Sequence, residues 1–166
     1  MNKVFLTFIM FLFSFMQVNA LSYNYSSTKS VPIKLKIVKE IDSESEIYEG
    51  QKINFITISD VQYNGKLVVA RGEIIPAKIE TIVTSGMNGF PAEIIVDEFE
   101  IPGIKSSQLV GTSVKKGQNR ALWVYPLKWA LTPIPFVGSL TNLIMGGHAK
   151  INSTDIFTVY YYPEWK

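Results

Sequence analysis

The 166-residue chain contains no cysteine and only one histidine, His148. Without cysteine there are no disulfides, thiol nucleophiles, thiolate metal sites or lipoprotein anchor. Any site that needs two imidazoles is also excluded. Charge is scarce too: 16 basic and 14 acidic residues leave a net charge of +2. A nucleic-acid-binding domain needs a clear basic excess, so we expect no nucleic-acid partner, and no motif indicates a cofactor.

Long apolar runs are absent except at the N-terminus. There, Lys3 precedes an apolar stretch over residues 4–16, and small residues, Val18 and Ala20, stand at the positions read by a signal peptidase. We therefore predict a secretory signal peptide over residues 1–20, cleaved between Ala20 and Leu21. An uncleaved anchor is disfavoured because a spanning helix needs about 20 apolar residues. After cleavage no second run remains to form a helical membrane span.

The predicted leader also places the protein. Secreted eukaryotic domains of this size usually carry disulfides, whereas this chain has none. A bacterial periplasm, cell surface or extracellular space fits better. Residues 21–30 are polar and serine-rich, which is typical of a flexible tail. The rest, residues 31–166, is predicted to form one β-rich domain.

Hydrophobic periodicity is mostly two. Ile33, Leu35 and Ile37 alternate with lysines, as in a strand with one wet face. Asn64-Gly65 between apolar runs predicts a tight hairpin, since both residues tolerate positive φ. Other strands are predicted near residues 47–48 and over residues 53–58, 74–83 and 92–101, with a turn at 86–89 and a final strand over 156–162.

Two further elements follow from the same pattern. Residues 109–114 and 121–125 are predicted to form a hairpin around a loop at 115–119. Residues 135–145, with a proline at the start and Gly146-Gly147 at the end, predict one short helix. Pro76 indicates an edge or irregular position in its strand. The expected fold is a mainly β, single small sandwich or barrel-like domain.

One segment resembles a known group of proteins. Asn64-Gly65-Lys66, followed by the run Gly72-Glu73-Ile74-Ile75-Pro76-Ala77-Lys78-Ile79, is similar to a hairpin and strand in bacterial cell-envelope β-domains, including those of type IV secretion core proteins. The resemblance covers residues 64–79. It implies a β architecture and an envelope location, and it assigns no functional residue.

Aromatic residues form two groups that suggest partner binding. Trp123, Tyr125 and Trp129 fall within seven residues, and Tyr161 and Trp165 lie near the C-terminus. Exposed Trp and Tyr side chains suit stacking on sugar rings or docking onto a protein. The competing interpretation is packing in the core or at its rim.

Basic residues suggest a second type of contact. Lys115, Lys116 and Arg120 fall in one predicted turn. There they would meet an anionic partner such as a lipid headgroup, a cell-wall polymer or an acidic protein surface. Alternatively, they only keep the turn hydrated.

Candidates for chemistry are few. His148 would act as a general base only with a partner that no motif supplies. Asp97, Glu98 and Glu100 form an acidic cluster, with Glu98 and Glu100 on one face of a predicted strand. A solvated strand face explains the cluster without a metal or an acid/base pair. No catalytic residue and no metal site is therefore predicted.

These observations favour an exported envelope protein with a non-catalytic binding or structural role toward a protein or glycan. Two alternatives remain open. One is a small outer-membrane β-barrel, against which several short predicted strands and the prolines count. The other is a hydrolase of cell-wall or surface polymers that uses His148 or the region of Glu98 and Glu100.

Overall fold

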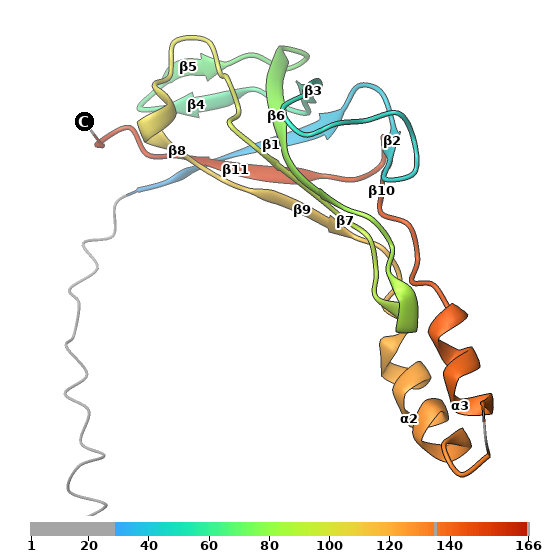
Figure 1. Ribbon diagram of the computed structural model, residues 1–166. Helices are drawn as coiled ribbons and strands as arrows, with labels where there is room; N and C mark the ends of the chain where they lie inside the picture. Colours follow the sequence, from blue (N-terminus) through green and yellow to red (C-terminus); the bar gives the residue numbers. More distant parts are fainter. Residues whose placement is uncertain (1–28, 135, 166) are drawn as a thin grey trace, which may run out of the picture.

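A curled antiparallel sheet forms the body of the protein. The computed structural model describes residues 29–134 and 136–165. Seven strands pair in the order β8-β11-β1-β3-β6-β7-β9 and curl into a half-barrel (Figure 1). The mainly β fold expected from the sequence is thus confirmed. The strands are β1 (Val31–Ile37), β3 (Lys52–Thr57), β6 (Ile74–Val83), β7 (Glu93–Asp97), β8 (Leu109–Val110), β9 (Ser113–Lys116) and β11 (Phe157–Tyr161).

The predicted signal peptide, its cleavage point between Ala20 and Leu21, and most of the predicted tail lie outside the described residues. The first strand, β1, begins at Val31, where the sequence predicts that the folded domain starts.

Two short antiparallel pairs flank the sheet. The β4 (Val61–Tyr63) and β5 (Lys66–Val69) strands form the hairpin predicted around Asn64-Gly65. Asn64 has φ 50° and Gly65 has φ 74°, the left-handed values that a tight hairpin turn requires. The other pair joins β2 (Ile41–Asp42) to β10 (Lys150–Ile151). The short strand predicted near residues 47–48 is wrong, since pairing with β10 selects Ile41–Asp42 instead.

Strand alternation fills the concave side of the sheet with apolar side chains. Ile33 and Leu35 are fully buried and Ile37 nearly so, as the alternation in β1 predicts. Phe55 of β3 is also fully buried, and its ring lies 5.4 Å from that of Phe99 and 5.5 Å from that of Phe157, measured between centroids. The core is completed by residues from the other strands and from the two short pairs: Ile53, Ile75, Ala77, Ile79, Ile94, Val96, Val159, Ile41, Ile151, Val61 and Val69.

The predicted hairpin of residues 109–114 and 121–125 is wrong. Strand β8 pairs with β11 and β9 pairs with β7, so the two halves of the first predicted strand go to opposite ends of the sheet. Lys115 and Lys116 therefore lie in β9 and not in a turn. Long-range pairing decides these strands, and local periodicity carries no information about which partner a strand meets.

Residues 121–125 begin a helix, α2 (Ala121–Leu131), where the sequence predicts a strand. The side chain of Asn119 accepts a hydrogen bond from the Ala121 N–H, and the backbone N–H of Arg120 bonds to Gly89 O. These contacts satisfy orphan donors at the helix start. The helix predicted over residues 135–145 is confirmed as α3 (Val137–Leu140) and η3 (Thr141–Leu143). Two further single turns are η1 (Met87–Gly89) and η2 (Ser106–Gln108).

Pro76, which the sequence predicts to be irregular, behaves as expected, and Gly72 lies in the bend before the same strand. Pro76 pairs with Asn54 of β3, but pairing with β7 begins only at Lys78, so the proline lies beyond the end of that ladder. Gly72 has φ 82° in the bend between β5 and β6. On the β7 side, Pro76 therefore needs no ladder hydrogen bond from the N–H that proline lacks. Gly72 adopts a left-handed conformation that other residues disfavour.

The two ends of the curled sheet face one another across an open cleft. Gly111 and Thr112 connect β8 to β9, and a cleft of about 330 Å³ lies between β9 and β11. The Lys115 ammonium and the Asp155 carboxylate bridge it at 2.7 Å. Hydrogen bonds from Lys115 and from the backbone N–H of Asn152 hold the pKa of Asp155 below its usual range.

We predict that Asp155→Asn lowers the free energy of unfolding by about 1 kcal/mol at neutral pH, because the Lys115 pair is lost. Because its pKa is lowered in the folded state, the ionised Asp155 carboxylate contributes its full stability above the ordinary aspartate pKa of about 3.9. The difference between the two proteins should therefore shrink as the pH falls through the lowered value. Urea titrations across acidic pH test this, with the exposed Glu80→Gln as control; a difference that persists in strong acid would contradict it.

A second prediction separates the two faces of β1. Leu35→Ala should cost about 3 kcal/mol, because it opens a cavity in the filled concave side. Lys36→Ala, one position along on the exposed face, should change stability by less than about 0.5 kcal/mol. Equal losses in urea unfolding would mean that the alternation does not define the core.

Candidate functional site

A helical hairpin projects from one end of the sheet. It comprises residues 121–145, inserted between β9 and β10, and contains α2, α3 and η3. Figure 1 shows it extending well beyond the strands, at the end opposite the C-terminus. Among the described residues, it meets the rest of the protein mainly through η1, which contacts both α2 and η3. The hairpin therefore contributes little to the core of the sheet.

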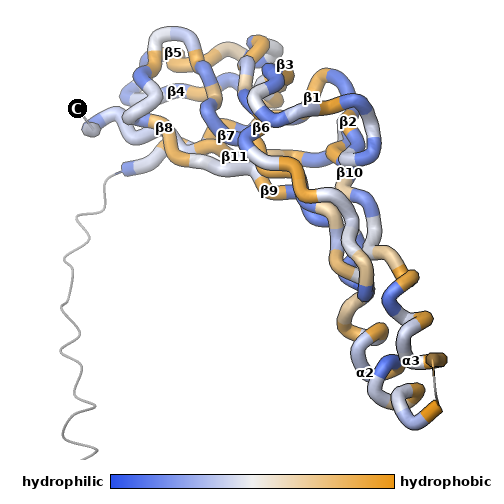
Figure 2. Tube along the Cα trace, in the orientation of Figure 1, coloured by the Kyte–Doolittle hydropathy of each residue, from blue (hydrophilic) through white to orange (hydrophobic). Residues whose placement is uncertain are grey.

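The helical hairpin exposes large apolar side chains. Phe136 is 89% exposed, Leu122 81% and Trp129 76%. Apolar segments recur down to the tip (Figure 2). The further exposed apolar residues of the hairpin are Trp123, Tyr125, Leu127, Ile134, Leu140, Leu143 and Met145. Monomeric proteins rarely expose many large apolar side chains together, so this surface is the candidate interaction site.

The apolar exposure extends around most of α2. Ala121 and Val124 face inward and are buried, and Lys128 and Leu131 are partly covered on the same side. Every other residue of the helix is exposed, and none of those is charged. A helix that is apolar on nearly all sides is normally surrounded by other material. Here α3 and η3 cover only one side of it.

A narrow junction of three chain segments connects the helical hairpin to the sheet. This neck consists of residues 86–92, 117–120 and 144–148. Backbone hydrogen bonds link all three segments: Gly146 N–H to Gly86 O, Ala92 N–H to Gly147 O, Gly147 N–H to Gln118 O, Gly117 N–H to Ala92 O, and Gly89 N–H to Ile144 O. Main-chain bonds therefore join the hairpin to the sheet at several points of the neck.

Glycines make this close approach possible. A Cβ on Gly146 would overlap the backbone carbonyl of Phe90, and one on Gly117 would overlap the carbonyl of Gly147. At Gly89, which has φ 79°, a Cβ would lie 2.6 Å from the backbone N of Ala121. Real Cβ atoms do not approach backbone this closely, so the geometry of the neck requires these glycines.

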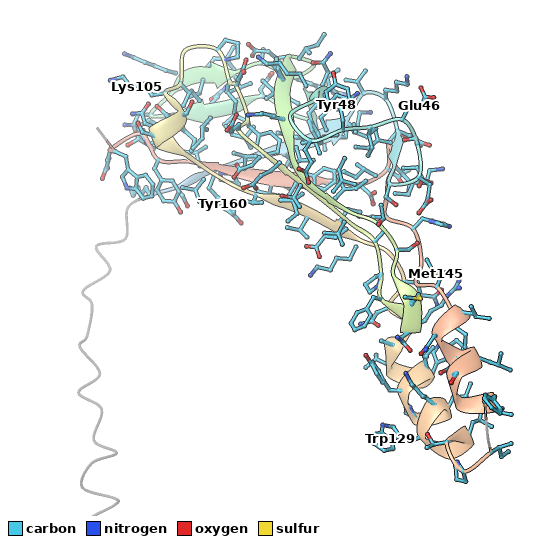
Figure 3. All side chains as sticks on the ribbon, in the orientation of Figure 1. Glu46, Tyr48, Lys105, Trp129, Met145 and Tyr160 are labelled. Carbon is cyan, nitrogen blue, oxygen red and sulfur yellow. The ribbon has the colours of Figure 1, made fainter. Side chains whose placement is uncertain are left out.

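Lys128 is the only charged residue between positions 121 and 147. Its ammonium donates to the side-chain oxygen of Asn142 at 2.8 Å and lies 3.4 Å from that of Asn88 in η1. The charge is thus held on the side of η1, because helical side chains lean toward the helix N-terminus. Trp129 lies far from the sheet and Met145 lies near the neck (Figure 3). The distal part of the helical hairpin therefore carries no charge.

The three predicted basic residues lie in or near the neck, and each has a different partner. Lys115 is bound to Asp155, and Lys116 lies 3.2 Å from the carboxylate of Glu93. Arg120 donates to the backbone carbonyl of Met145 at 3.3 Å and, within the described residues, has no carboxylate partner. Of the three, only Arg120 keeps an uncompensated charge.

The aromatic candidates do not form one site. Trp123, Tyr125 and Trp129 lie on α2, and Tyr125 packs edge-on against Phe90 of the neck at 6.2 Å between centroids. The remaining two candidates lie at the far end of the sheet. Tyr161 packs against the core, and Trp165 stacks on Tyr162 with centroids 4.2 Å apart.

The residues considered for hydrolysis occupy separate, ion-paired positions. His148 Nδ1 lies 2.8 Å from the Glu44 carboxylate. Strand β7 ends at Asp97, and Glu98 has φ 51°, so the predicted shared strand face for Glu98 and Glu100 does not exist. These two carboxylates pair with Lys78 and Lys52 respectively. About 20 Å of extended strand separates Glu98 from the neck, where His148 lies.

Ser85 completes the local arrangement near His148. Its hydroxyl lies 3.4 Å from the same Glu44 oxygen that faces the imidazole. The serine is thus directed at the carboxylate and not at the ring that would have to accept its proton. In the described part of the chain, no group of three or more acidic or histidine side chains is placed to hold a metal ion.

Sequence reasoning missed the most exposed residues of the hairpin, Leu122 and Phe136. The signal for them was the run of residues 121–147, in which Lys128 is the only charged side chain. None of the helices in residues 29–134 and 136–165 has the length and apolar character that crossing a bilayer requires.

Comparison of the chain with protein-family models, with curated proteins and with solved structures gives no match. The chemistry and geometry of its own residues therefore carry the functional argument.

We predict that Gly146→Ala lowers the free energy of unfolding by about 2–3 kcal/mol, because the added methyl meets the Phe90 carbonyl in a backbone-bonded neck. Gly86→Ala is the matched control in the same neck. Its nearest contact is the Phe90 Cβ at 3.3 Å, so a small shift accommodates it. Urea unfolding of both variants measures the difference; similar losses would show that close packing does not control the neck.

Proposed function

We propose that the protein is an exported component of a bacterial cell envelope with a non-catalytic binding role, and that the helical hairpin is its binding element. The observation that carries the proposal is the exposure of Leu122, Trp129 and Phe136 on a projection that the core of the sheet does not need. Trp and Phe are typical anchors of binding surfaces.

The body of the protein suits a scaffold. Its concave side is filled by side chains, and its titratable candidates are engaged in ion pairs near the surface. The neck fixes the helical hairpin to this body through several backbone hydrogen bonds. A rigid support reduces the ordering cost of binding, so a projecting element on such a support binds more tightly than a free segment.

The export half of the proposal rests on the leader-like residues 1–20 and on the absence of cysteine. We expect fractionation of the native host, followed by N-terminal sequencing, to recover a chain that starts at Leu21 from the envelope. A chain that starts at Met1 in the cytoplasmic fraction would contradict export.

The binding half is tested in the same host with substitutions that do not touch the core. The hairpin variant, Leu122→Ser with Trp129→Ser and Phe136→Asn, should be released from the particulate envelope fraction. A control variant, Tyr48→Ser with Leu67→Ser and Ile74→Thr, removes exposed apolar residues from the sheet body. It should fractionate as the native protein does; release of both variants, or of neither, would refute a binding role for the hairpin.

A further inference from the structure

We infer that the helical hairpin enters one leaflet of a lipid bilayer, with Arg120 and Lys128 at the level of anionic headgroups. The inference rests on the proposed binding role and names the partner. Four features support a bilayer over a protein groove or a second copy of the chain. They are the breadth of the apolar surface, the distribution of charge, the length of the hairpin and the internal bonding of its polar groups.

The breadth of the apolar surface favours a fluid surrounding. A protein groove takes up one stripe of a helix, with anchors at spacings of three, four and seven residues. On α2, Leu122 and Trp129 share one face, since seven residues make nearly two turns, but Trp123 and Leu127 are exposed on a different face. The exposed residues between them are apolar too. Lipid acyl chains cover such a surface from all sides, whereas a groove leaves part of it in water.

The charges lie where a headgroup layer would meet them. Arg120 precedes α2 in the neck, and the Lys128 ammonium is directed back toward Asn88 of η1. Beyond Lys128 no Asp, Glu, Lys or Arg occurs until Lys150. Long basic side chains at a membrane surface extend in this way, with the stem in the apolar region and the charge at the interface. Neither cation has a carboxylate partner among the described residues.

The length of the hairpin matches a single leaflet. Helix α2 has 11 residues, which corresponds to about 16 Å at 1.5 Å per residue. Half of a hydrocarbon core that is about 30 Å thick is about 15 Å. Trp123 and Tyr125, in the first turns of α2, then lie near the headgroups, where Trp and Tyr are enriched. Trp129 and Phe136 reach further into the acyl chains.

Several polar groups near the tip are satisfied within the hairpin. The Thr132 hydroxyl donates to Lys128 O, and the Thr141 hydroxyl donates to Gly138 O. Backbone N–H groups at the turn are bonded as well: Thr132 to Trp129 O, Ile134 to Leu131 O, Val137 to Ile134 O, and Ser139 to Phe136 O. Because hydrocarbon offers no hydrogen-bond partners, internal bonding of this kind lowers the cost of entry.

The test measures flotation of the chain from Leu21 onward, which includes every described residue, with vesicles of phosphatidylcholine alone or mixed with phosphatidylglycerol. We expect binding to both and tighter binding to the mixture. The hairpin variant should bind at least about a hundredfold more weakly, since three large apolar side chains no longer enter the lipid. The control variant on the sheet body should bind as the native protein does.

Charge and depth are measured separately. Lys128→Gln keeps hydrogen-bonding capacity and should reduce binding to the mixed vesicles about fivefold, with little change for phosphatidylcholine alone. Variants that keep only one of the three tryptophans report depth. Lipids brominated on the acyl chain should quench Trp129 more than Trp123, and leave Trp165 at the far end of the sheet unquenched.

Three results would overturn the inference. Flotation of the native chain and the hairpin variant to the same extent would show that the hairpin does not enter lipid. No flotation, together with a dimer that the hairpin variant loses in analytical ultracentrifugation, would assign the surface to a second copy. No flotation, together with hairpin-dependent retention in the host envelope, would leave the proposed binding role intact and assign the surface to another envelope partner. Loss of hairpin-dependent retention itself would instead refute the proposed function.

Discussion

Filling the concave side of the curled sheet is the constraint on which the other features depend. Phe55 lies at the centre of that space, in contact with the rings of Phe99 and Phe157. Alternating residues of β1, β3, β6 and β7 close around it, and the two short strand pairs complete the cover. Because these elements alone fill the interior, the helical hairpin contributes no side chain to the core of the sheet. Its apolar residues are therefore not accounted for by folding.

The neck fixes the direction of the helical hairpin relative to the sheet. Three segments approach at backbone distance, which only glycine permits at Gly117 and Gly146, and main-chain hydrogen bonds join them. Hydrogen bonds of this kind, together with the contact between Tyr125 and Phe90, hold the position of the hairpin without a large shared core. The hairpin can thus remain apolar on its outer surface while its direction relative to the sheet is set. A flexible linker in the same place would lose this orientation and add an ordering cost to binding.

Local patterns in the sequence predict the elements that interactions between neighbouring residues determine. The Asn64-Gly65 turn, the alternation of β1 and the strand over residues 74–83 are all present in the structure. The strand predicted at residues 121–125 is wrong because bonds from Asn119 and Gly89 begin a helix there. The pairing of β8 and β9 with opposite ends of the sheet depends on contacts that no local pattern contains. For the same reason, the sequence could not show that the aromatic group of Tyr161 and Trp165 lies at the other end of the sheet from the group on α2.

Phe136 shows why the fold alone does not explain the composition of the tip. It has φ 66°, a left-handed conformation that is unfavourable for a bulky residue. Asn64 and Asn88 share such values, but asparagine tolerates them. Glu98 also has a positive φ. Its conformation is supported by the hydrogen bond from its backbone N–H to the Asp97 carboxylate and by its ion pair with Lys78. Phe136 has no such hydrogen bond or ion pair from the described residues and is 89% exposed, so a glycine or asparagine would adopt this conformation at lower cost. In the inferred bilayer-bound state, transfer of the ring into acyl chains offsets the unfavourable backbone conformation.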